Sequence, residues 1–201
     1  YMGILDAYLG PIPENFSHEG EDFTPESFGK KTGLDPDDYV ADSVLSPLLN
    51  IAISNNLDIC YFQSITTSDY SHKASKSDLQ KTPTVTVIDG PTFIGKYSYR
   101  NQVWGYLVNR HFLLDTGLRF IEGRWVADAV FTPQLFLKAR RMAMVDIDAY
   151  RYMVVPNSAM TTRESEHYLK VMYDLLNNIQ VFDEIIRNEK TRATDPTALL
   201  R

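Results

Sequence analysis

The sequence has very few residues that bind transition metals or form cross-links: one cysteine, Cys60, and four histidines in 201 residues. One cysteine excludes an intramolecular disulfide and a zinc ribbon. No two histidines are four residues apart, the spacing at which one helix face can share a metal ion. Cys60 lies in the apolar run DICYF, which predicts a thiol buried in the core.

Long apolar runs are also missing. None approaches the 18 or more residues of a membrane span, and the first 30 residues lack the pattern of a signal peptide. With the lone cysteine, this favours a soluble protein of the reducing cytoplasm, and association with a membrane surface stays open.

Positive charge is scarce, with a net charge of −6 and a pI of about 5.2. A nucleic-acid partner would need a concentrated basic stripe. The two compact basic clusters, 138–141 and 187–192, are better explained as solvated helix faces, so we expect no nucleic-acid partner.

What is present is 44% hydrophobic residues, enough for one globular domain. Residues 1–33 are rich in Pro, Gly, Glu and Ser and predict an irregular segment. Apolar periodicity predicts helices and strands in mixed order, which favours an α/β fold. The expected helices are 42–56, 129–141 and 163–188, and the expected strands are 58–63, 84–88, 142–145 and 149–155, with a β-prone stretch at 102–108. The apolar face of the last helix, from Tyr168 to Ile186, is expected to pack in the core.

Three carboxylates, Asp35, Asp37 and Asp38, fall within four residues in LDPDDYV. Because like charges repel, the folded state needs a reason to hold them together. One is a solvent-exposed turn, and the other is a hard cation that prefers oxygen ligands. An EF-hand is excluded, since Tyr39 occupies a ligand position and Val40 the position that requires glycine.

Three phrases together resemble a known family: LDPDDYV at 34–40, VADAVFTPQLFLKA at 126–139 and AYRYMVVPNS at 149–158. With them, the stretch 34–162 resembles the acceptor-side half of a family 2 glycosyltransferase, which has the GT-A fold. The resemblance implies an α/β domain over 34–201 with an incomplete, GT-A-like mixed sheet flanked by helices.

The resemblance also assigns roles. Asp35 and Asp37 would hold Mg²⁺ or Mn²⁺ against the diphosphate of a nucleotide sugar, and Asp38 would be the extra acid of this cofactor site. The cation would neutralise charge on the departing diphosphate. Asp128 matches the general base that deprotonates the acceptor hydroxyl. Taken alone, Asp128 is better explained as an acid in the first turn of a helix, which the helix dipole favours.

Two tryptophans are candidates for acceptor binding, where an aromatic ring could stack on a sugar. Trp104 lies in NQVWGYLVNR, which resembles a segment along the acceptor cleft of the family, and Trp125 is close to Asp128 in sequence. A role in core packing is the alternative for Trp104.

The implied function is therefore an inverting, metal-dependent transfer of sugar from a nucleotide-sugar donor to a saccharide or glycan acceptor, as in polysaccharide biosynthesis. The sequence departs from the family at three places. Ala127 stands where the first acid of an acidic pair is expected, Met153 and Val155 stand where arginines are expected, and 1–33 does not resemble the nucleotide-binding half. A non-catalytic carbohydrate-binding or scaffolding module is the alternative.

Overall fold

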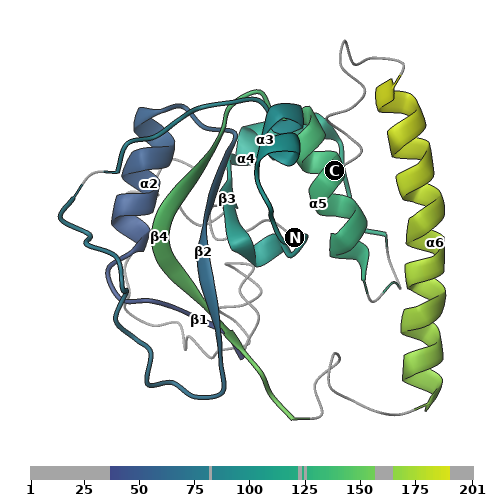
Figure 1. The fold of residues 1–201 in the computed structure, drawn as a ribbon, viewed down its shortest axis with the longest axis horizontal. Helices are drawn as coiled ribbons and strands as arrows, with labels where there is room; N and C mark the ends of the chain where they lie inside the picture. Colours follow the sequence, from purple (N-terminus) through teal and green to yellow (C-terminus); the bar gives the residue numbers. More distant parts are fainter. Residues whose placement is uncertain (1–36, 82, 122–123, 125, 157–164, 191–201) are drawn as a thin grey trace, which may run out of the picture.

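The computed structural model describes residues 37–190 apart from 82, 122–123, 125 and 157–164. Helices and strands occur in mixed order along this part of the chain, which confirms the predicted α/β class (Figure 1). In chain order the elements are β1 (Tyr39–Val40), α2 (Leu45–Ser54), β2 (Ile59–Thr67), α3 (Gly90–Lys96), the 3₁₀ turn η2 (Val103–Gly105), β3 (Tyr106–Val108), α4 (Arg110–Thr116), α5 (Ala127–Lys138), β4 (Met142–Met153) and α6 (Ser165–Lys190).

The sheet is mixed, with strand order β1-β4-β2-β3. β2 and β4 are parallel, while β1 pairs antiparallel with β4, and β3 with β2. The predicted strand 58–63 is confirmed as the first part of β2. The segments 142–145 and 149–155 were expected as two strands, but they form the single strand β4. The register of β4 against β2 shifts around Gln63, as at a β-bulge. The expected break between 145 and 149 is therefore a local irregularity within one strand.

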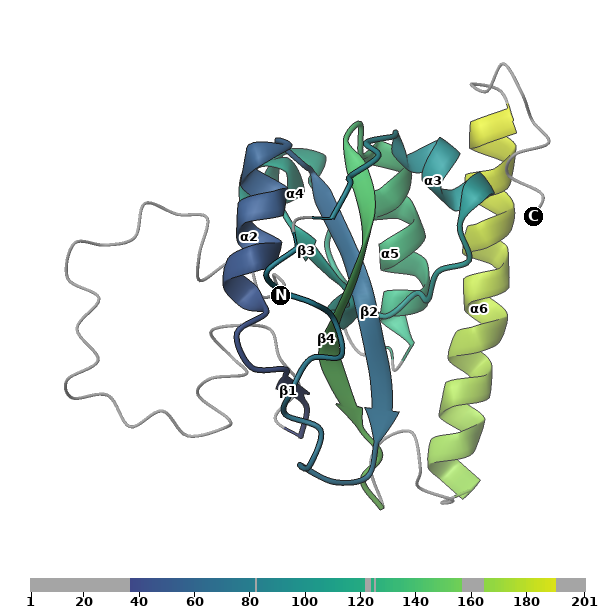
Figure 2. The ribbon, with the colours of Figure 1, turned by 60° about the vertical axis from the view of Figure 1, so that its left-hand side comes forward.

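Helices cover both faces of the sheet (Figures 1 and 2). One apolar cluster lies between α2 and the sheet and includes Leu48, Phe62 and Tyr150. The other lies between the sheet and α3, α4 and α5 and includes Phe93 and Phe136. The sheet is therefore the middle layer, and α6 stands outside α5. No helix in the described part of the chain is long and apolar enough to cross a membrane.

The expected helices 42–56, 129–141 and 163–188 are confirmed as α2, α5 and α6 to within a few residues, with 163 and 164 outside the described residues. The helix α5 ends at Lys138, three residues earlier than expected. Asp58 explains the early end, because its Oδ2 accepts hydrogen bonds from the backbone N–H groups of Arg140 and Arg141 at 2.8 and 3.0 Å. Cys60 is buried as predicted, and burial raises the pKa of its thiol to about 12.

The expected strand 84–88 is wrong, since only Ile88 forms a bridge, to Met142. The segment before it runs along the outer edge of β4 and bonds through serine side chains instead of a backbone ladder. Ser75 Oγ donates to the carbonyl of Asp148 at 2.7 Å, and Ser77 Oγ accepts from the Asp148 N–H at 2.8 Å. The β-branched residues that suggested a strand are thus next to a sheet edge without extending it.

The packing predicted for α6 is also wrong. Tyr168, Met172, Leu175 and Ile179 were expected in the core but are 61, 40, 41 and 61% exposed. The buried side of α6 carries polar Asp174 instead, next to α5. Periodicity identified the helix and its apolar face, but it could not indicate which face meets the rest of the domain.

Candidate functional site

Asp38 is fixed at the carboxyl end of β4. Its Oδ2 accepts a hydrogen bond of 2.7 Å from the Tyr150 hydroxyl, and its Oδ1 accepts one of 2.7 Å from the backbone N–H of Met153. Asp37 lies in the preceding turn with its side chain exposed, and its carbonyl accepts from the Tyr70 hydroxyl at 3.3 Å. The carboxylate of Asp38 thus orients the turn, and that of Asp37 faces solvent.

Trp104 shares Tyr150 with Asp38. The indole stacks on the Tyr150 ring with 4.8 Å between centroids and 5° between planes, and on the Tyr152 ring at 5.3 Å and 15°. Trp104 is half-buried and packs against the cluster beneath α2. These contacts agree with the alternative that Trp104 packs in the core, and stacking of its ring on a sugar stays a prediction.

Asp128 lies in the first turn of α5 and is half-buried. Desolvation raises the pKa of its carboxyl above the ordinary value of 3.8, opposed by a hydrogen bond from the Ala129 N–H. One turn further along the helix, Thr132 Oγ1 bonds the hydroxyl of buried Tyr106 at 3.1 Å. The negative charge of Asp128 contributes to the raised pKa of Tyr106, after desolvation. A carboxylate with a raised pKa is a stronger base than an exposed one.

These groups lie toward one end of the sheet. The helix α5 runs back along the sheet before the chain turns into β4, so its first turn lies toward the end where β4 finishes (Figure 1). No contact within the described residues joins Asp128 to Asp38. The resemblance implies one cleft faced by Asp128 and by Asp35, Asp37 and Asp38, because the diphosphate and the acceptor hydroxyl must meet at one sugar carbon, and this stays a prediction. Two of the predicted site residues, Asp35 and Trp125, lie outside the described residues.

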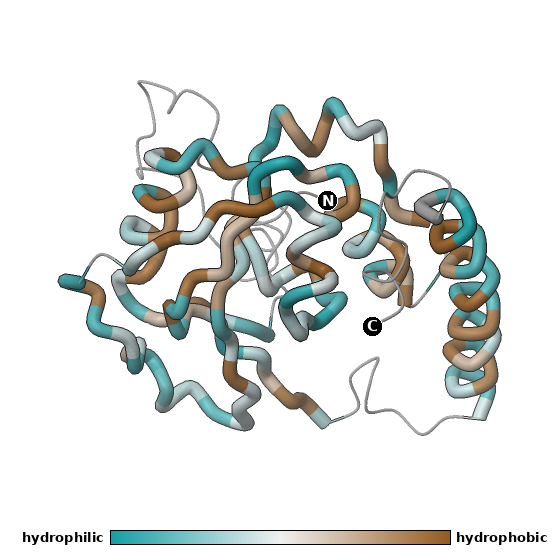
Figure 3. The backbone as a smooth tube through the Cα atoms, turned by 45° about the horizontal axis from the view of Figure 1, so that its top comes forward, coloured by the Kyte–Doolittle hydropathy of each residue, from teal (hydrophilic) through white to brown (hydrophobic). Residues whose placement is uncertain are grey.

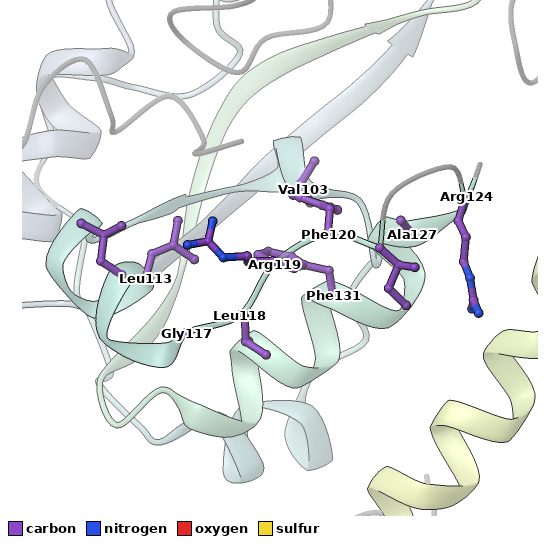
Figure 4. Close-up of a pocket in the computed structure, with 11 residues that line it drawn as sticks. Val103, Leu113, Gly117, Leu118, Arg119, Phe120, Arg124, Ala127 and Phe131 are labelled. Atoms are coloured by element: carbon purple, nitrogen blue, oxygen red, sulfur yellow. The ribbon is translucent and has the colours of Figure 1, made fainter.

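A cavity of about 650 Å³ adjoins the start of α5 (Figure 4). It is lined by residues from α4, the connection after it and α5, and Phe120 closes one wall by stacking on Phe131 at 4.2 Å. Val103 and Ala127, the chain neighbours of Trp104 and Asp128, contribute to its lining. The sequence analysis did not predict this cavity, although it named Trp104 and Asp128, the neighbours of two lining residues, as candidates for the acceptor side.

Arg151 of β4 anchors a neighbouring loop, a role that the sequence analysis did not predict. It is fully buried, and its guanidinium forms two hydrogen bonds with Asp148, Nη1 to Oδ1 at 2.8 Å and Nη2 to Oδ2 at 2.9 Å. Its remaining donors reach the carbonyls of His72 at 2.7 Å, Ala74 at 3.0 Å and Tyr150 at 3.2 Å. Arg151 therefore fastens the loop 72–77 to β4. The alternation along AYRYM, which turns Arg151 away from Tyr150 and Tyr152, was the signal available in the sequence.

Few side chains in the described residues could bind a divalent cation. The described residues contain no group of three or more His, Cys, Asp or Glu that could hold a metal. Both oxygens of Asp38 are engaged by protein donors, which leaves the exposed Asp37 in this turn. Mg²⁺ is commonly bound through one or two carboxylates together with water and substrate phosphates. Asp37 with Asp35 would fit that pattern, whereas a site made of protein ligands alone would not.

Comparison with protein-family models finds no match, and no curated protein matches the sequence. Solved structures of S. aureus TarS match part of this chain, each with a TM-score below 0.5. TarS 1–349 in complex with UDP-GlcNAc is 15% identical over 74% of this chain and 44% of that chain, with a TM-score of 0.48. TarS itself matches with 16% identity over 76% of this chain and 24% of that chain, with a TM-score of 0.47. TarS 1–349 in complex with UDP is 18% identical over 73% of this chain and 39% of that chain, with a TM-score of 0.44. The chain spans less than half the length of these structures.

Proposed function

We propose that this chain is the acceptor-side part of a glycosyltransferase that moves a sugar from a nucleotide-sugar donor to a saccharide or glycan acceptor, with inversion and with Mg²⁺ or Mn²⁺. The observation that carries the proposal is the position of Asp38. Its bonds to Tyr150 and Met153 hold the Asp38 carboxylate at the carboxyl end of β4, the end toward which the first turn of α5 also lies. Ligand sites in α/β sheets are typically built at this end.

The chain's own residues divide the work. Asp37, with Asp35, would hold the cation, which supplies charge neutralisation for the diphosphate when bound. Asp38 positions the turn through its two hydrogen bonds. Asp128 would accept the proton of the acceptor hydroxyl, and desolvation of its carboxyl, which raises its pKa, makes it a better proton acceptor.

We expect this chain to bind a donor weakly by itself. Met153 and Val155 stand where the resembled family has arginines, so two charge-assisted hydrogen bonds to the diphosphate are missing. At about 1.5–3 kcal/mol each, their loss would weaken affinity by roughly 10²–10⁴-fold. The same two residues favour the second candidate, a non-catalytic carbohydrate-binding or scaffolding module.

Calorimetric titration with UDP and with GDP, each with Mn²⁺, tests the proposal on the wild type and on Asp37→Ala. Asp37 is exposed, so this substitution leaves the core intact. Weak binding that is lost in the variant and without Mn²⁺ supports the transferase. Binding that is absent, or that persists in Asp37→Ala, contradicts the metal site. Glycan binding without any nucleotide binding would favour the non-catalytic module.

A further inference from the structure

The cavity of about 650 Å³ at the start of α5 is positively charged as well as apolar. Its lining among the described residues contains two arginines, Arg119 and Arg124, and no acid. The whole chain has 26 acidic and 20 basic residues, so this lining runs against the overall charge. Exposed apolar side chains also recur along α6 (Figure 3), but the described lining comes from η2, α4, the connection after it and α5.

Both arginines are available to a ligand. Neither forms an ion pair within the described part of the chain, and Arg119 is exposed there. Arg124 is half-buried, and its Nη1 is buried with no hydrogen-bond partner among the same residues. A buried donor without a partner is costly, and an oxygen of a bound molecule at this end of the cavity would reduce that cost.

Figure 4 shows the two cations at opposite ends of the cavity. The Arg119 side chain extends toward α4, whereas Arg124 lies beyond Ala127 at the start of α5. Phe120 and Phe131 form the wall between them, with stacked rings 4.2 Å apart. A molecule in the cavity therefore meets a positive charge at each end and an apolar surface in the middle.

We propose that the cavity is the acceptor subsite and that it takes an acidic saccharide, one that carries a carboxylate or a phosphate. This inference rests on the proposed function, because it places in the cavity the acceptor that Asp128 would deprotonate. A guanidinium binds either anion through two parallel N–H···O bonds. The volume is within the usual range of ligand sites, about 300–1,000 Å³, which are mostly apolar with a few polar groups that fix orientation.

The arrangement keeps the anionic group away from the base. Ala127 lines the cavity and precedes Asp128, so a hydroxyl at the α5 end would be the one nearest to the base. Arg119 would hold the anionic group at the α4 end, and Arg124 would donate to sugar oxygens near α5. The separation matters because a second negative charge beside Asp128 would repel its carboxylate.

Ligand-observed NMR titration of the full chain tests the ligand class with glucuronate, glucose 6-phosphate and glucose, without nucleotide or metal. We expect an acidic sugar to bind about tenfold more tightly than glucose, as one hydrogen-bonded ion pair provides. Whichever of the two acidic sugars binds more tightly distinguishes carboxylate from phosphate. Equal or absent binding of all three would overturn the proposal. Acetate or inorganic phosphate binding as tightly as the acidic sugar would also overturn it, because the cavity wall would then contribute nothing.

Arg119→Gln should abolish the preference for the acidic sugar and leave the binding of glucose unchanged. Arg119 is exposed, so this substitution does not disturb the core. Arg140→Gln is the matched control, because Arg140 is also exposed but does not line the cavity, and the preference should persist. A preference that survives Arg119→Gln, or that is lost equally in Arg140→Gln, would contradict the role of Arg119.

The titration separates this inference from the proposed function. The proposed function is tested by binding of UDP or GDP with Mn²⁺ at Asp37, which involves no residue of the cavity. Binding of an acidic sugar that depends on Arg119, in a chain that binds no nucleotide, would confirm the ligand of the cavity and remove its role in transfer. Nucleotide binding without a preference for an acidic sugar would overturn the acceptor class alone.

Discussion

The Tyr150 hydroxyl donates a 2.7 Å hydrogen bond to Oδ2 of Asp38, joining two residues 112 positions apart in the sequence. The bond connects Asp38 to Tyr150 of β4, whose ring also stacks on Trp104. One hydroxyl therefore links Asp38 to Tyr150, which packs on Trp104, a candidate for acceptor binding. We expect its removal to lower the stability of the fold.

Tyr150→Phe should lower the free energy of unfolding by about 1–2 kcal/mol, since the hydrogen bond to a carboxylate is lost without a change of ring packing. Urea unfolding followed by circular dichroism measures it. The control is Tyr70→Phe. The Tyr70 side chain is exposed, and its hydroxyl donates a longer bond, of 3.3 Å, to the Asp37 carbonyl. Equal effects of both substitutions would show that the Tyr150–Asp38 bond has no special weight.

Arg151→Ala should cost about 3–5 kcal/mol, because it leaves Asp148 as an unpaired, largely buried charge. The same substitution should make the loop 72–77 accessible to limited proteolysis, since the guanidinium no longer holds the carbonyls of His72 and Ala74. Arg187→Ala is the matched control: its ion pair with Asp183 is exposed and should contribute less than about 1 kcal/mol.

Gly90→Ala should prevent stable folding or cost more than about 3 kcal/mol, as overpacking of a core does at its worst. A Cβ at this position would lie 1.6 Å from the carbonyl oxygen of Phe136, a backbone atom of α5 that cannot turn away. Gly105→Ala is the control, because its Cβ would meet only the Tyr61 ring at 3.6 Å or more. Thermal unfolding of both variants checks the difference, and a Gly90→Ala chain as stable as Gly105→Ala would refute the close approach of α3 to α5.

Asp128 should make stability depend on pH. Burial raises the pKa of its carboxyl in the folded chain above the unfolded value near 3.8, so the folded state binds its proton more tightly. Stability from this group is present below pH 3.8 and is lost as the pH rises through the folded pKa. Asp128→Asn should remove that loss, so the variant gains stability relative to the wild type from pH 3.5 to 7. A stability difference that is flat across this range, measured by urea unfolding, would contradict the raised pKa.

Much of the fold could be predicted because its signals are local. The amphipathic period of α2 and α5 and the apolar run of β2 identified these elements within a few residues. The segment 84–88 has the composition of a strand, but of it only Ile88 bridges β4, at Met142, while the hydroxyls of Ser75 and Ser77 bond the β4 edge at Asp148. Propensity cannot register such side-chain bonds.

The candidate site was predictable in its residue types and much less in its contacts. Asp38 was expected to serve a cofactor site, yet its oxygens bond Tyr150 and Met153. That arrangement depends on the pairing of β1 with β4, a long-range register. The polar docking side of α6 is a similar case, because Asn178 is buried where α6 packs beside α5 and bonds the carbonyl of Val126, 52 positions away.

The serine-bonded loop along β4 also has a consequence for behaviour at high concentration. An open strand edge offers unpaired N–H and C=O groups to any other chain, and it is a template for aggregation. Ser75 and Ser77 occupy those groups at Asp148, and Ser77 Oγ reaches the Asp146 carbonyl as well. The loop 72–77 therefore shields this part of the β4 edge, and lifting it would leave backbone groups at Asp146 and Asp148 open to pairing with a strand of another chain.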